Sequence, residues 1–390
     1  MFGPITIAKV KGIPIKIDFS WIIVFALVTS TLGSELGNYL KNLNPISLVF
    51  WAVIGSLVFF LSLLLHEMSH AIVAQKEKIG VKSVTLFIFG GVAQLTREPE
   101  SPGSEFRMAA AGPAVSILLG IFFLVIWYLA IQASFSPPVI LLAQILGITN
   151  LALGIFNLVP AFPLDGGRIF RAIVWAITKD LHKATGYAVT LGRLFAFILA
   201  LWGITDLVRA DIITGFWKIF IGFFLYQIAS ASLRMMTVRK AISGSRVADI
   251  MTSPPVTVPP YITVAQLVYE YFLVHRIFSY PVTENGTPVG IISTEEIRKI
   301  PRENWDYITV SQVMKPVTDD MLISSEEDME NAFCKMSGES KERLLVLYEG
   351  KLVGVLSLSD VTRFVEIKKR LDENGDYVTE IQEPEKHFKA

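Results

Sequence analysis

Six long apolar stretches dominate the sequence, and all of them lie before residue 235. A helix needs roughly 20 residues to cross the ~30 Å hydrocarbon core of a bilayer. Of the 390 residues, 52% are hydrophobic and only 18% are charged, whereas soluble domains carry about 25% charged residues. The sequence therefore predicts a multi-pass integral membrane protein in a lipid bilayer. The predicted spans are residues 18–33, 46–74, 106–133, 138–158, 186–206 and 212–233.

The distribution of Lys and Arg predicts the orientation of these spans. Fifteen basic residues lie before span one, between spans two and three, after span four and after span six, against two or three in the other connections. Cytosolic connections carry an excess of Lys and Arg. Both termini are therefore predicted to be cytosolic. Three lysines also precede span one, as in a signal peptide, but no convincing cleavage site follows, so span one is expected to be retained.

Composition excludes other classes of protein. The net charge is zero and the pI is near 7.0, so nothing favours nucleic acid as a partner. The single cysteine, Cys334, excludes an internal disulfide framework and suits a reducing compartment.

Two features interrupt the helical pattern. Residues 81–95, VKSVTLFIFGGVAQL, are rich in β-branched and aromatic residues around Gly90-Gly91, which predicts a short hairpin. Because non-helical backbone at membrane depth must be buried in protein or line a cavity, this hairpin is expected to lie beside one.

The second feature is an internal repeat after residue 240. VADIM at 247–251 matches VSQVM at 310–314, and GIISTEEI at 290–297 matches GVLSLSDV at 354–361. Each copy also holds a turn between short β-rich runs, Asn285-Gly286 or Glu349-Gly350. The first of these turns starts a glycosylation acceptor pattern, for which a cytosolic location makes the turn the better interpretation. The predicted domains are 1–240 in the membrane, repeats at 245–301 and 308–368, and a charged tail at 369–390.

One short motif carries the chemistry. His66-Glu67-Met68-Ser69-His70 fits H-E-x-x-H, which places both histidines on one helix face, where they can bind one zinc ion. The glutamate between them can act as general base toward an attacking water. The alternative is a pair of polar residues that only packs helices. Ionisable groups within a span are energetically costly and usually functional, which favours the metal site.

A catalytic zinc ion needs a third protein ligand. His182, His275 and His387 lie in a connection, the repeats and the tail, so none is well placed. Asp165, in FNLVPAFPLDGGR, is the better candidate, because spans two and four bring it and His66 to similar depth on the cytosolic side. The alternative is that Asp165 caps a helix that begins near Arg168.

Four motifs together resemble the site-2 protease family of intramembrane zinc metalloproteases: HEMSHA at 66–71, FGGVAQL at 89–95, AAGPAVS at 110–116 and FNLVPAFPLDGGR at 156–168. The resemblance implies that His66, His70 and Asp165 bind zinc and that Glu67 is catalytic. It also implies that Asn157 holds the substrate carbonyl or the oxyanion. The alternative for Asn157, and for Asn150, is hydrogen bonding between helices.

The repeats resemble a pair of cystathionine-β-synthase-type (CBS) domains, a regulatory module that often binds adenine nucleotides such as ATP. In that family a hydroxyl residue and an acid three positions later bind ribose. Ser357 and Asp360 fit this pattern well, whereas Ser293 and Glu296 fit it less well because glutamate replaces aspartate. The alternative is a dimerising module without a ligand, which would make the chain a homodimer through its CBS domains.

The sequence thus predicts a polytopic α-helical membrane domain with an embedded β-hairpin, followed by a cytosolic α/β tandem CBS pair. The predicted function is a zinc endopeptidase that cleaves transmembrane segments of other proteins, regulated by the CBS pair. The hairpin is expected to receive an unwound substrate segment as an added strand; alternatively it only plugs the protein. The alternative function is a CBS-regulated membrane channel or transporter, which predicts polar residues spread along a pathway rather than clustered.

Overall fold

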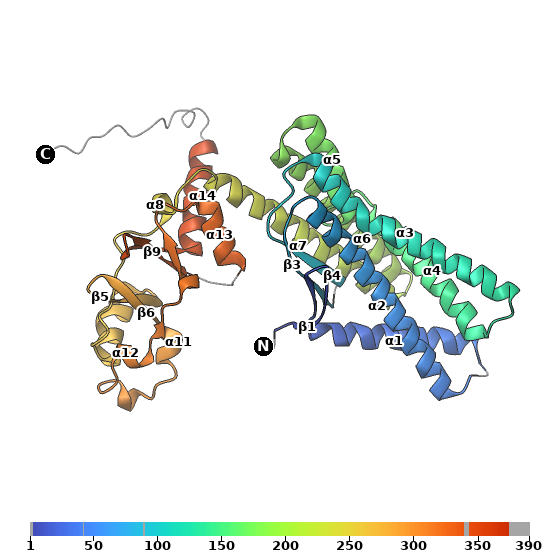
Figure 1. Cartoon of the computed structure of the whole chain (residues 1–390), viewed down its shortest axis with the longest axis horizontal. Helices are drawn as coiled ribbons and strands as arrows, with labels where there is room; N and C mark the ends of the chain where they lie inside the picture. The colour runs from blue at the N-terminus through green and yellow to red at the C-terminus, as the bar shows by residue number, and fades with distance from the viewer. Residues whose placement is uncertain (1–2, 42, 89, 339–342, 374–390) are drawn as a thin grey trace. The chain divides into compact units, whose positions relative to one another are not determined.

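The structure is a computed structural model that describes all residues except 1–2, 42, 89, 339–342 and 374–390. The chain divides into two compact units, Met1–Leu233 and Arg234–Ala390 (Figure 1). The first unit holds long helices and a small sheet, and the second holds two α/β repeats. This architecture is the predicted fold class.

The elements of the first unit follow the predicted spans closely. They are β1 (Ile5–Val10), β2 (Ile13–Ile17), α1 (Ser20–Tyr39), α2 (Pro45–Lys76), β3 (Val81–Phe87), β4 (Gly90–Leu95), α3 (Pro102–Gln132), α4 (Pro137–Asn157), α5 (Asp165–Thr178), α6 (Leu181–Val208) and α7 (Ile212–Ile242). From Arg234 onward, α7 belongs to the second unit.

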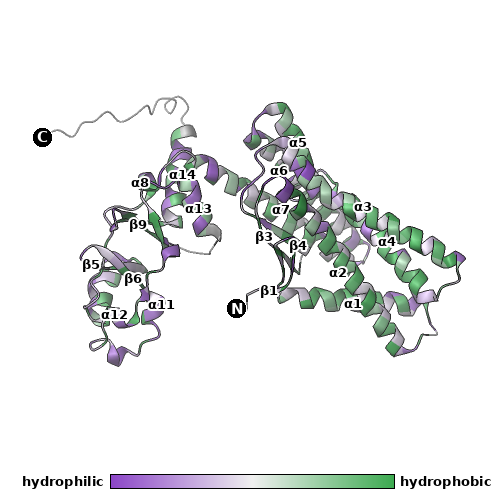
Figure 2. Ribbon diagram, in the orientation of Figure 1, coloured by the Kyte–Doolittle hydropathy of each residue, from purple (hydrophilic) through white to green (hydrophobic). Residues whose placement is uncertain are grey.

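Six of these helices, α1 to α4, α6 and α7, are long and apolar enough to cross a membrane. Figure 2 shows hydrophobic residues along their length. Large apolar side chains are exposed on them, as expected of helix faces that meet lipid rather than water. Examples are Leu27, Phe122, Ile213 and Phe216, with exposed fractions of 60%, 55%, 85% and 70%.

Local capping explains where α2 and α3 begin. The Asn44 side chain accepts a hydrogen bond from the backbone N–H of Ser47 (2.7 Å), and Pro45 is the first residue of α2. The Ser101 hydroxyl accepts in the same way from Ser104 N–H (3.2 Å), ahead of Pro102 in α3. Each cap satisfies an otherwise unpaired N–H, and proline loses nothing at the first helical position.

Helices α3 and α4 pack closely through glycines. A Cβ added at Gly120 would lie 2.6 Å from the Cγ atom of Leu151, and one at Gly147 would lie 2.7 Å from a methyl group of Leu124. Small residues allow such close approach of helices, which replaces the hydrophobic driving force that is weak in lipid.

The predicted hairpin is present as β3 and β4, which pair antiparallel. It is part of a larger sheet, with strand order β1-β2-β3-β4, in which β2 and β3 run parallel. Strands β1 and β2 were not predicted, although ITIAKVKGIPIKI alternates apolar and polar residues around Lys11-Gly12, where φ is positive at both positions. Ile13, Ile15 and Val84 of the sheet pack on Met68 of α2, so the sheet lies against the helix that carries the H-E-x-x-H motif.

In the second unit the repeats form two three-stranded sheets, ordered β5-β6-β7 and β10-β9-β8. Asn285-Gly286 and Glu349-Gly350 are turns with positive φ at both residues, as predicted. Residues 369–373, predicted as tail, belong to α14, and 374–390 lie outside the described residues. The elements are α8 (Val247–Ile250), α9 (Val264–Gln266), the π-helix Leu267–Phe272, α10 (Leu273–His275), β5 (Ser279–Glu284), β6 (Thr287–Ser293), α11 (Thr294–Ile297), the 3-10 helix Arg302–Asn304, α12 (Val310–Val313), β7 (Lys315–Pro316), the 3-10 helix Asp319–Met321, β8 (Leu322–Ser324), α13 (Met329–Gly338), β9 (Arg343–Tyr348), β10 (Lys351–Ser357) and α14 (Leu358–Glu373).

Candidate metal centre

Three side chains from two helices converge inside the first unit. Nε2 of His66 and Nε2 of His70 lie 3.3 Å apart, and each lies 3.2 Å from Oδ2 of Asp165. The histidines are 3% and 7% exposed. Within the described residues, these three side chains form the group of His, Cys, Asp or Glu whose ligand atoms lie close enough together to hold one metal ion. The structure thus brings together the three predicted ligands, from the C-terminal third of α2 and the start of α5.

The second nitrogen of each imidazole, Nδ1, also lies within hydrogen-bonding distance of another group. Nδ1 of His70 donates a hydrogen bond to the backbone carbonyl of Met108 (2.7 Å), and Nδ1 of His66 lies 2.8 Å from the hydroxyl of Ser116. A carbonyl only accepts, so His70 carries its proton on Nδ1 when the ring is neutral. Its Nε2 lone pair then faces the Asp165 carboxylate. Such contacts to the second nitrogen commonly orient histidines that bind metals.

The donor set fits zinc. Two imidazole nitrogens and one carboxylate oxygen, with a position left open, are a usual combination in catalytic zinc sites. When both rings carry their protons on Nδ1, the two Nε2 lone pairs and those of the carboxylate lie within 3.3 Å of one another, an arrangement that a cation between them would stabilise.

Asp165 does not cap the helix that it begins. The cap position of α5 is Leu164, which makes no side-chain cap hydrogen bond, and Asp165 is the first helical residue. Its carboxylate points to the two histidines instead. The helix therefore begins three residues earlier than predicted.

Two glycines leave room for the polar groups of α2. A Cβ added at Gly112 of α3 would lie 2.1 Å from Nε2 of His70 and 2.6 Å from Nε2 of His66. A Cβ added at Gly91 of β4 would lie 2.4 Å from Cγ of Glu67. Real Cβ atoms do not approach other atoms so closely. The backbones of α3 and β4 are therefore in direct contact with the motif.

A buried ion pair fixes α5, and with it Asp165, against α3. The guanidinium of Arg171 donates two hydrogen bonds to Oε1 of Glu105, one of them from Nε at 2.7 Å. The Glu105 side chain is 1% exposed and that of Arg171 is 10% exposed. Arg168, one turn after Asp165, lies 4.0 Å from the same oxygen. Buried charges require such pairing.

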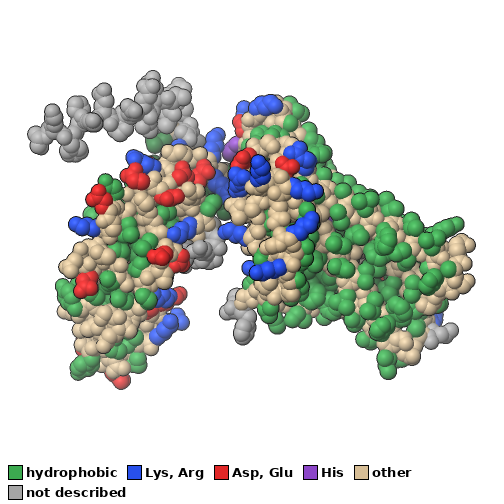
Figure 3. Space-filling view, viewed as in Figure 1, with side chains coloured by type: hydrophobic (Ala, Val, Ile, Leu, Met, Phe, Trp, Pro, Cys, Tyr) green, Lys and Arg blue, Asp and Glu red, His purple; other side chains and the backbone are tan. Residues whose placement is uncertain are grey.

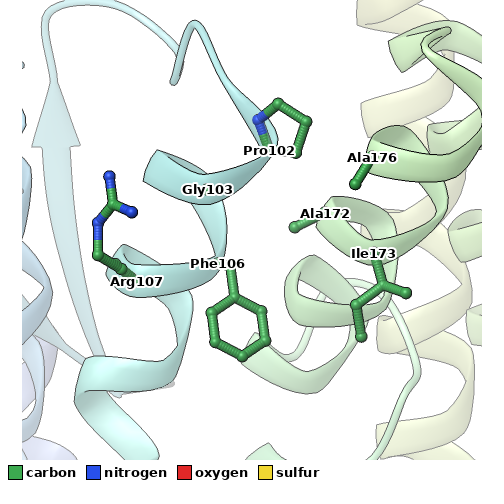
Figure 4. Close-up of a pocket in the computed structure, with 7 residues that line it drawn as sticks. All are labelled: Pro102, Gly103, Phe106, Arg107, Ala172, Ile173 and Ala176. Atoms are coloured by element: carbon green, nitrogen blue, oxygen red, sulfur yellow. The ribbon is translucent and has the colours of Figure 1, made fainter.

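A groove opens nearby between the same two helices. Figure 4 shows Phe106 from α3 and Ala172, Ile173 and Ala176 from α5 on its two sides. Its lining is mainly apolar, and none of the predicted site residues belongs to it.

The structure does not bring Asn157 into hydrogen-bonding contact with the metal-binding cluster. Its amide donates to the backbone carbonyl of Leu153 (3.1 Å), four residues earlier in α4. Asn150 behaves alike, donating to Leu146 (2.8 Å). Both side-chain amides therefore donate within α4 and not to another helix, so the alternative interpretation of the two residues is wrong.

In the second unit, each predicted ribose-binding pair is bonded to itself at the start of a helix. The Ser357 hydroxyl donates to Oδ2 of Asp360 (2.5 Å) ahead of α14, and the Ser293 hydroxyl donates to Oε2 of Glu296 ahead of α11. The backbone N–H of each serine donates to the same oxygen, at 2.8 and 3.1 Å. One carboxylate oxygen of each acid is thus left for another partner.

Comparison with known proteins identifies the family. The sequence profile of peptidase family M50 matches residues 54–136 and 130–201, and that of the CBS domain matches residues 247–303 and 310–367. The zinc metalloprotease MJ0392 of Methanocaldococcus jannaschii is 32% identical over 373 residues, which cover 95% of this chain and 99% of that protein. The chain belongs to peptidase family M50, the site-2 protease family.

Two further relatives extend the comparison. The protein named Rip3 of Mycobacterium tuberculosis is 30% identical over 394 residues, 100% of both chains. The solved structure of a site-2 protease from Methanocaldococcus jannaschii is 30% identical, covers 59% of this chain and 95% of its own, and has a TM-score of 0.41.

Membership of the M50 family makes this chain a zinc metalloprotease, and six of its helices are long and apolar enough to cross a membrane, which supports an intramembrane protease. The alternative of a channel or transporter is not supported. Sequence reasoning missed Gly112, Gly91, Glu105 and Arg171 as parts of the site. Two of them, Gly112 and Gly91, stand in motifs that carried the resemblance, AAGPAVS and FGGVAQL, but spacing alone gave no role to a glycine.

Proposed function

We propose that this site-2 protease binds zinc through His66, His70 and Asp165 and cleaves transmembrane segments of other membrane proteins with Glu67 as its general base. The observation that carries the proposal is the convergence of three metal-ligating atoms at 3.2 to 3.3 Å, with both outer imidazole nitrogens already held. Such a buried arrangement is energetically unfavourable without a cation.

The residues of the chain divide the chemistry between them. Zinc, when bound, lowers the pKa of a water to about 7 and polarises the substrate carbonyl. Glu67 takes a proton from the attacking water and returns it to the leaving amine. The Met108 carbonyl and the Ser116 hydroxyl keep the two imidazoles oriented throughout.

Strand β4 is proposed to receive the substrate. It lies at one end of the sheet and pairs with β3 on one side only, within the described residues. A helical substrate hides its peptide bonds and must unwind before attack. An unwound segment added along β4 would satisfy its backbone hydrogen bonds away from lipid, beside Gly91 and therefore beside Glu67.

Asn157 is proposed to hold the substrate carbonyl or the oxyanion. Its amide has a partner within α4, so it would have to exchange the Leu153 carbonyl for the substrate. Catalytic hydrogen bonds often form only once substrate is bound. Asn157→Ala should then slow cleavage while zinc content is unchanged; an unaltered rate would remove this role.

The site is proposed to face the cytosol, together with both termini and the CBS pair. Figure 3 shows Lys and Arg side chains gathered over the end of the first unit that carries the strands and α5. Lys9 and Lys16 belong to two of these strands, β1 and β2. The positive-inside rule supports a cytosolic position for this end. The test adds a protease to the cytosolic face of sealed vesicles of known orientation. A CBS pair that resists this digestion would refute the proposed orientation.

The CBS pair is proposed to regulate the protease by binding an adenine nucleotide at Asp360 and Ser357, or by forming a homodimer. Adding ATP or AMP to a purified cleavage assay, with Asp360→Ala as the control, tests the first mechanism. If neither nucleotide changes the rate, regulation through a homodimer is the remaining mechanism. Light scattering on the full chain measures its oligomeric state directly.

Zinc content and cleavage, measured on the same preparations, test the central proposal. The substrate is first identified as the membrane protein that accumulates uncut in cells that carry Glu67→Gln, and is then offered to the purified enzyme. Glu67→Gln should retain about one zinc per chain while cleavage falls by roughly 10²- to 10⁴-fold, the usual contribution of general acid–base catalysis. His66→Ala and Asp165→Ala should lose the zinc as well.

Two results would overturn the proposal. Cleavage by Glu67→Gln at the wild-type rate would exclude Glu67 as the base. Full zinc content in Asp165→Ala would exclude Asp165 as the third ligand, whatever its effect on activity.

A further inference from the structure

The acids of the two predicted ribose-binding pairs, Glu296 and Asp360, lie in equivalent surroundings. Each carboxylate is bonded through one oxygen to the serine three residues earlier. The other oxygen contacts a residue of the opposite repeat, the one that directly follows the segment 247–251 or 310–314. That residue is Thr252 for Asp360 and Lys315 for Glu296.

The backbone confirms that Thr252 and Lys315 occupy equivalent positions. Thr252 pairs antiparallel with Val355, and Lys315 pairs antiparallel with Ile291. Ile291 is the residue of the first repeat that corresponds to Val355 in the second. The preceding methionines also correspond: a Cβ on Gly354 would lie 2.3 Å from the sulfur of Met251, and one on Gly290 would lie 2.4 Å from that of Met314. The two sites therefore share a framework and differ in their side chains.

The side chains make chemically different contacts. The neutral Thr252 hydroxyl donates a hydrogen bond of 2.9 Å to Oδ1 of Asp360, in an exposed setting. The Lys315 ammonium forms an ion pair of 2.8 Å with Oε1 of Glu296, whose side chain is 7% exposed. Both contacts involve a carboxylate, but only the Lys315 ammonium gives its carboxylate a counter-charge.

These contacts affect a ligand hydroxyl differently. At Asp360, a ribose hydroxyl would replace one neutral hydroxyl by another, which changes little. At Glu296 it would replace an ammonium and leave a buried carboxylate without its counter-charge, which is unfavourable.

We propose that Lys315 closes the first of the two sites, so that the CBS pair takes one adenine nucleotide per chain, at Asp360. Lys315 is thus a residue that sets the stoichiometry of binding. The proposal rests on the proposed nucleotide binding and adds which site is open.

The test exchanges the two environments in the full-length protein. Lys315→Thr with Glu296→Asp gives the first site the residues of the second, and Thr252→Lys with Asp360→Glu does the reverse. Titration calorimetry with ATP and with AMP measures the number of sites. Thermal unfolding without nucleotide checks that each variant is folded.

We expect one site per chain in the wild type and two in Lys315→Thr/Glu296→Asp. Asp360→Ala and Thr252→Lys/Asp360→Glu should each weaken binding by at least about tenfold, the effect of losing a charged hydrogen-bond partner. Two sites in the wild type, or no more sites in Lys315→Thr/Glu296→Asp than in the wild type, would overturn the proposal. So would weaker binding by Lys315→Thr alone, which would make Lys315 a ligand of the phosphates.

The same titrations separate this proposal from the one on which it rests. If the wild type binds neither nucleotide but Lys315→Thr/Glu296→Asp binds one, closure by Lys315 is supported and nucleotide regulation of the natural chain is refuted. If no variant binds either nucleotide, both proposals are refuted.

Discussion

The metal centre and the CBS sites treat their carboxylates in opposite ways. Asp165 faces two imidazole nitrogens from a distant part of the chain, and within the described residues no Lys or Arg side chain forms a salt bridge with it. Glu296 and Asp360 are each bonded to a serine three residues away and to a second donor. Unsatisfied acceptors that converge from separate helices point to a missing cation. Acids that are already satisfied locally give much weaker evidence for a ligand.

The largest expected effect comes from filling the space against the histidines. Gly112→Ala would place a Cβ within 2.1 Å of Nε2 of His70, so at least one imidazole must move. A displacement of about 1 Å in a catalytic site commonly lowers the rate by roughly 100-fold. We expect a loss of that size in cleavage together with reduced zinc content, measured by metal analysis of the purified protein.

Gly186→Ala is the matched control for that substitution. Gly186 lies within α6, and a Cβ added there would meet no atom within 4 Å. Zinc content and activity should both be unchanged. Full zinc content and full activity in Gly112→Ala would show that the histidines are not held where the structure places them.

The next effect tests how the third ligand is fixed. Glu105→Gln removes the counter-charge of Arg171 and leaves a guanidinium buried without its partner. Breaking a buried ion pair from one side costs about 3–5 kcal/mol. We expect a clearly lower unfolding temperature, and loss of zinc at a lower temperature than in the wild type, because α5 carries Asp165.

Glu77→Gln provides the comparison at the surface. Glu77 also pairs with an arginine of α3, Arg107, through two hydrogen bonds of 2.7 and 2.8 Å, but Arg107 is 58% exposed. Solvent screens such pairs. The unfolding temperature should not change measurably. Equal effects of Glu105→Gln and Glu77→Gln would show that burial does not distinguish the two pairs.

The sequence predicted the helices well because their signal is strong and one-dimensional. Runs of apolar residues located all six long helices, and spacing four apart placed His66 and His70 on one face. The H-E-x-x-H pattern and the break at Pro160 and Pro163 then led to Asp165. These inferences need only the period of a helix and the preferences of a metal ion.

What could not be predicted depends on contacts between distant segments. Nothing local reveals that Gly112 contacts the histidines or that Glu105 pairs with Arg171, 66 residues later. Strands β1 and β2 were missed because a lysine-rich start before an apolar run dominated the interpretation. In the repeats, the sequence identified the acids but not Lys315, because its ion pair crosses from one repeat to the other.

The smallest expected effect concerns acid stability of the CBS pair. Burial raises the pKa of Glu296, but the ion pair with Lys315 and the hydrogen bond from Ser293 outweigh it and lower the pKa overall. A carboxyl whose pKa is lower in the folded state stabilises the protein above its unfolded pKa, about 4.3, and this stabilisation is lost as the pH falls through the folded value. Lys315, whose pKa is raised by Glu296, loses its contribution only at alkaline pH.

Lys315→Thr should therefore lower the unfolding temperature slightly at pH 7 and hardly at all once the pH is below the folded pKa of Glu296. Because Lys315 is 56% exposed, solvent screening should keep the difference under about 1 kcal/mol. Calorimetric unfolding of the full chain at a series of pH values between 7 and 3 measures it. Thr252→Val, which removes only a neutral hydroxyl at the equivalent position, should give a difference that does not follow the titration of Glu296. A Lys315→Thr effect of equal size at both ends of this range would mean that the ion pair does not stabilise the first repeat, and that the two CBS sites differ in shape alone.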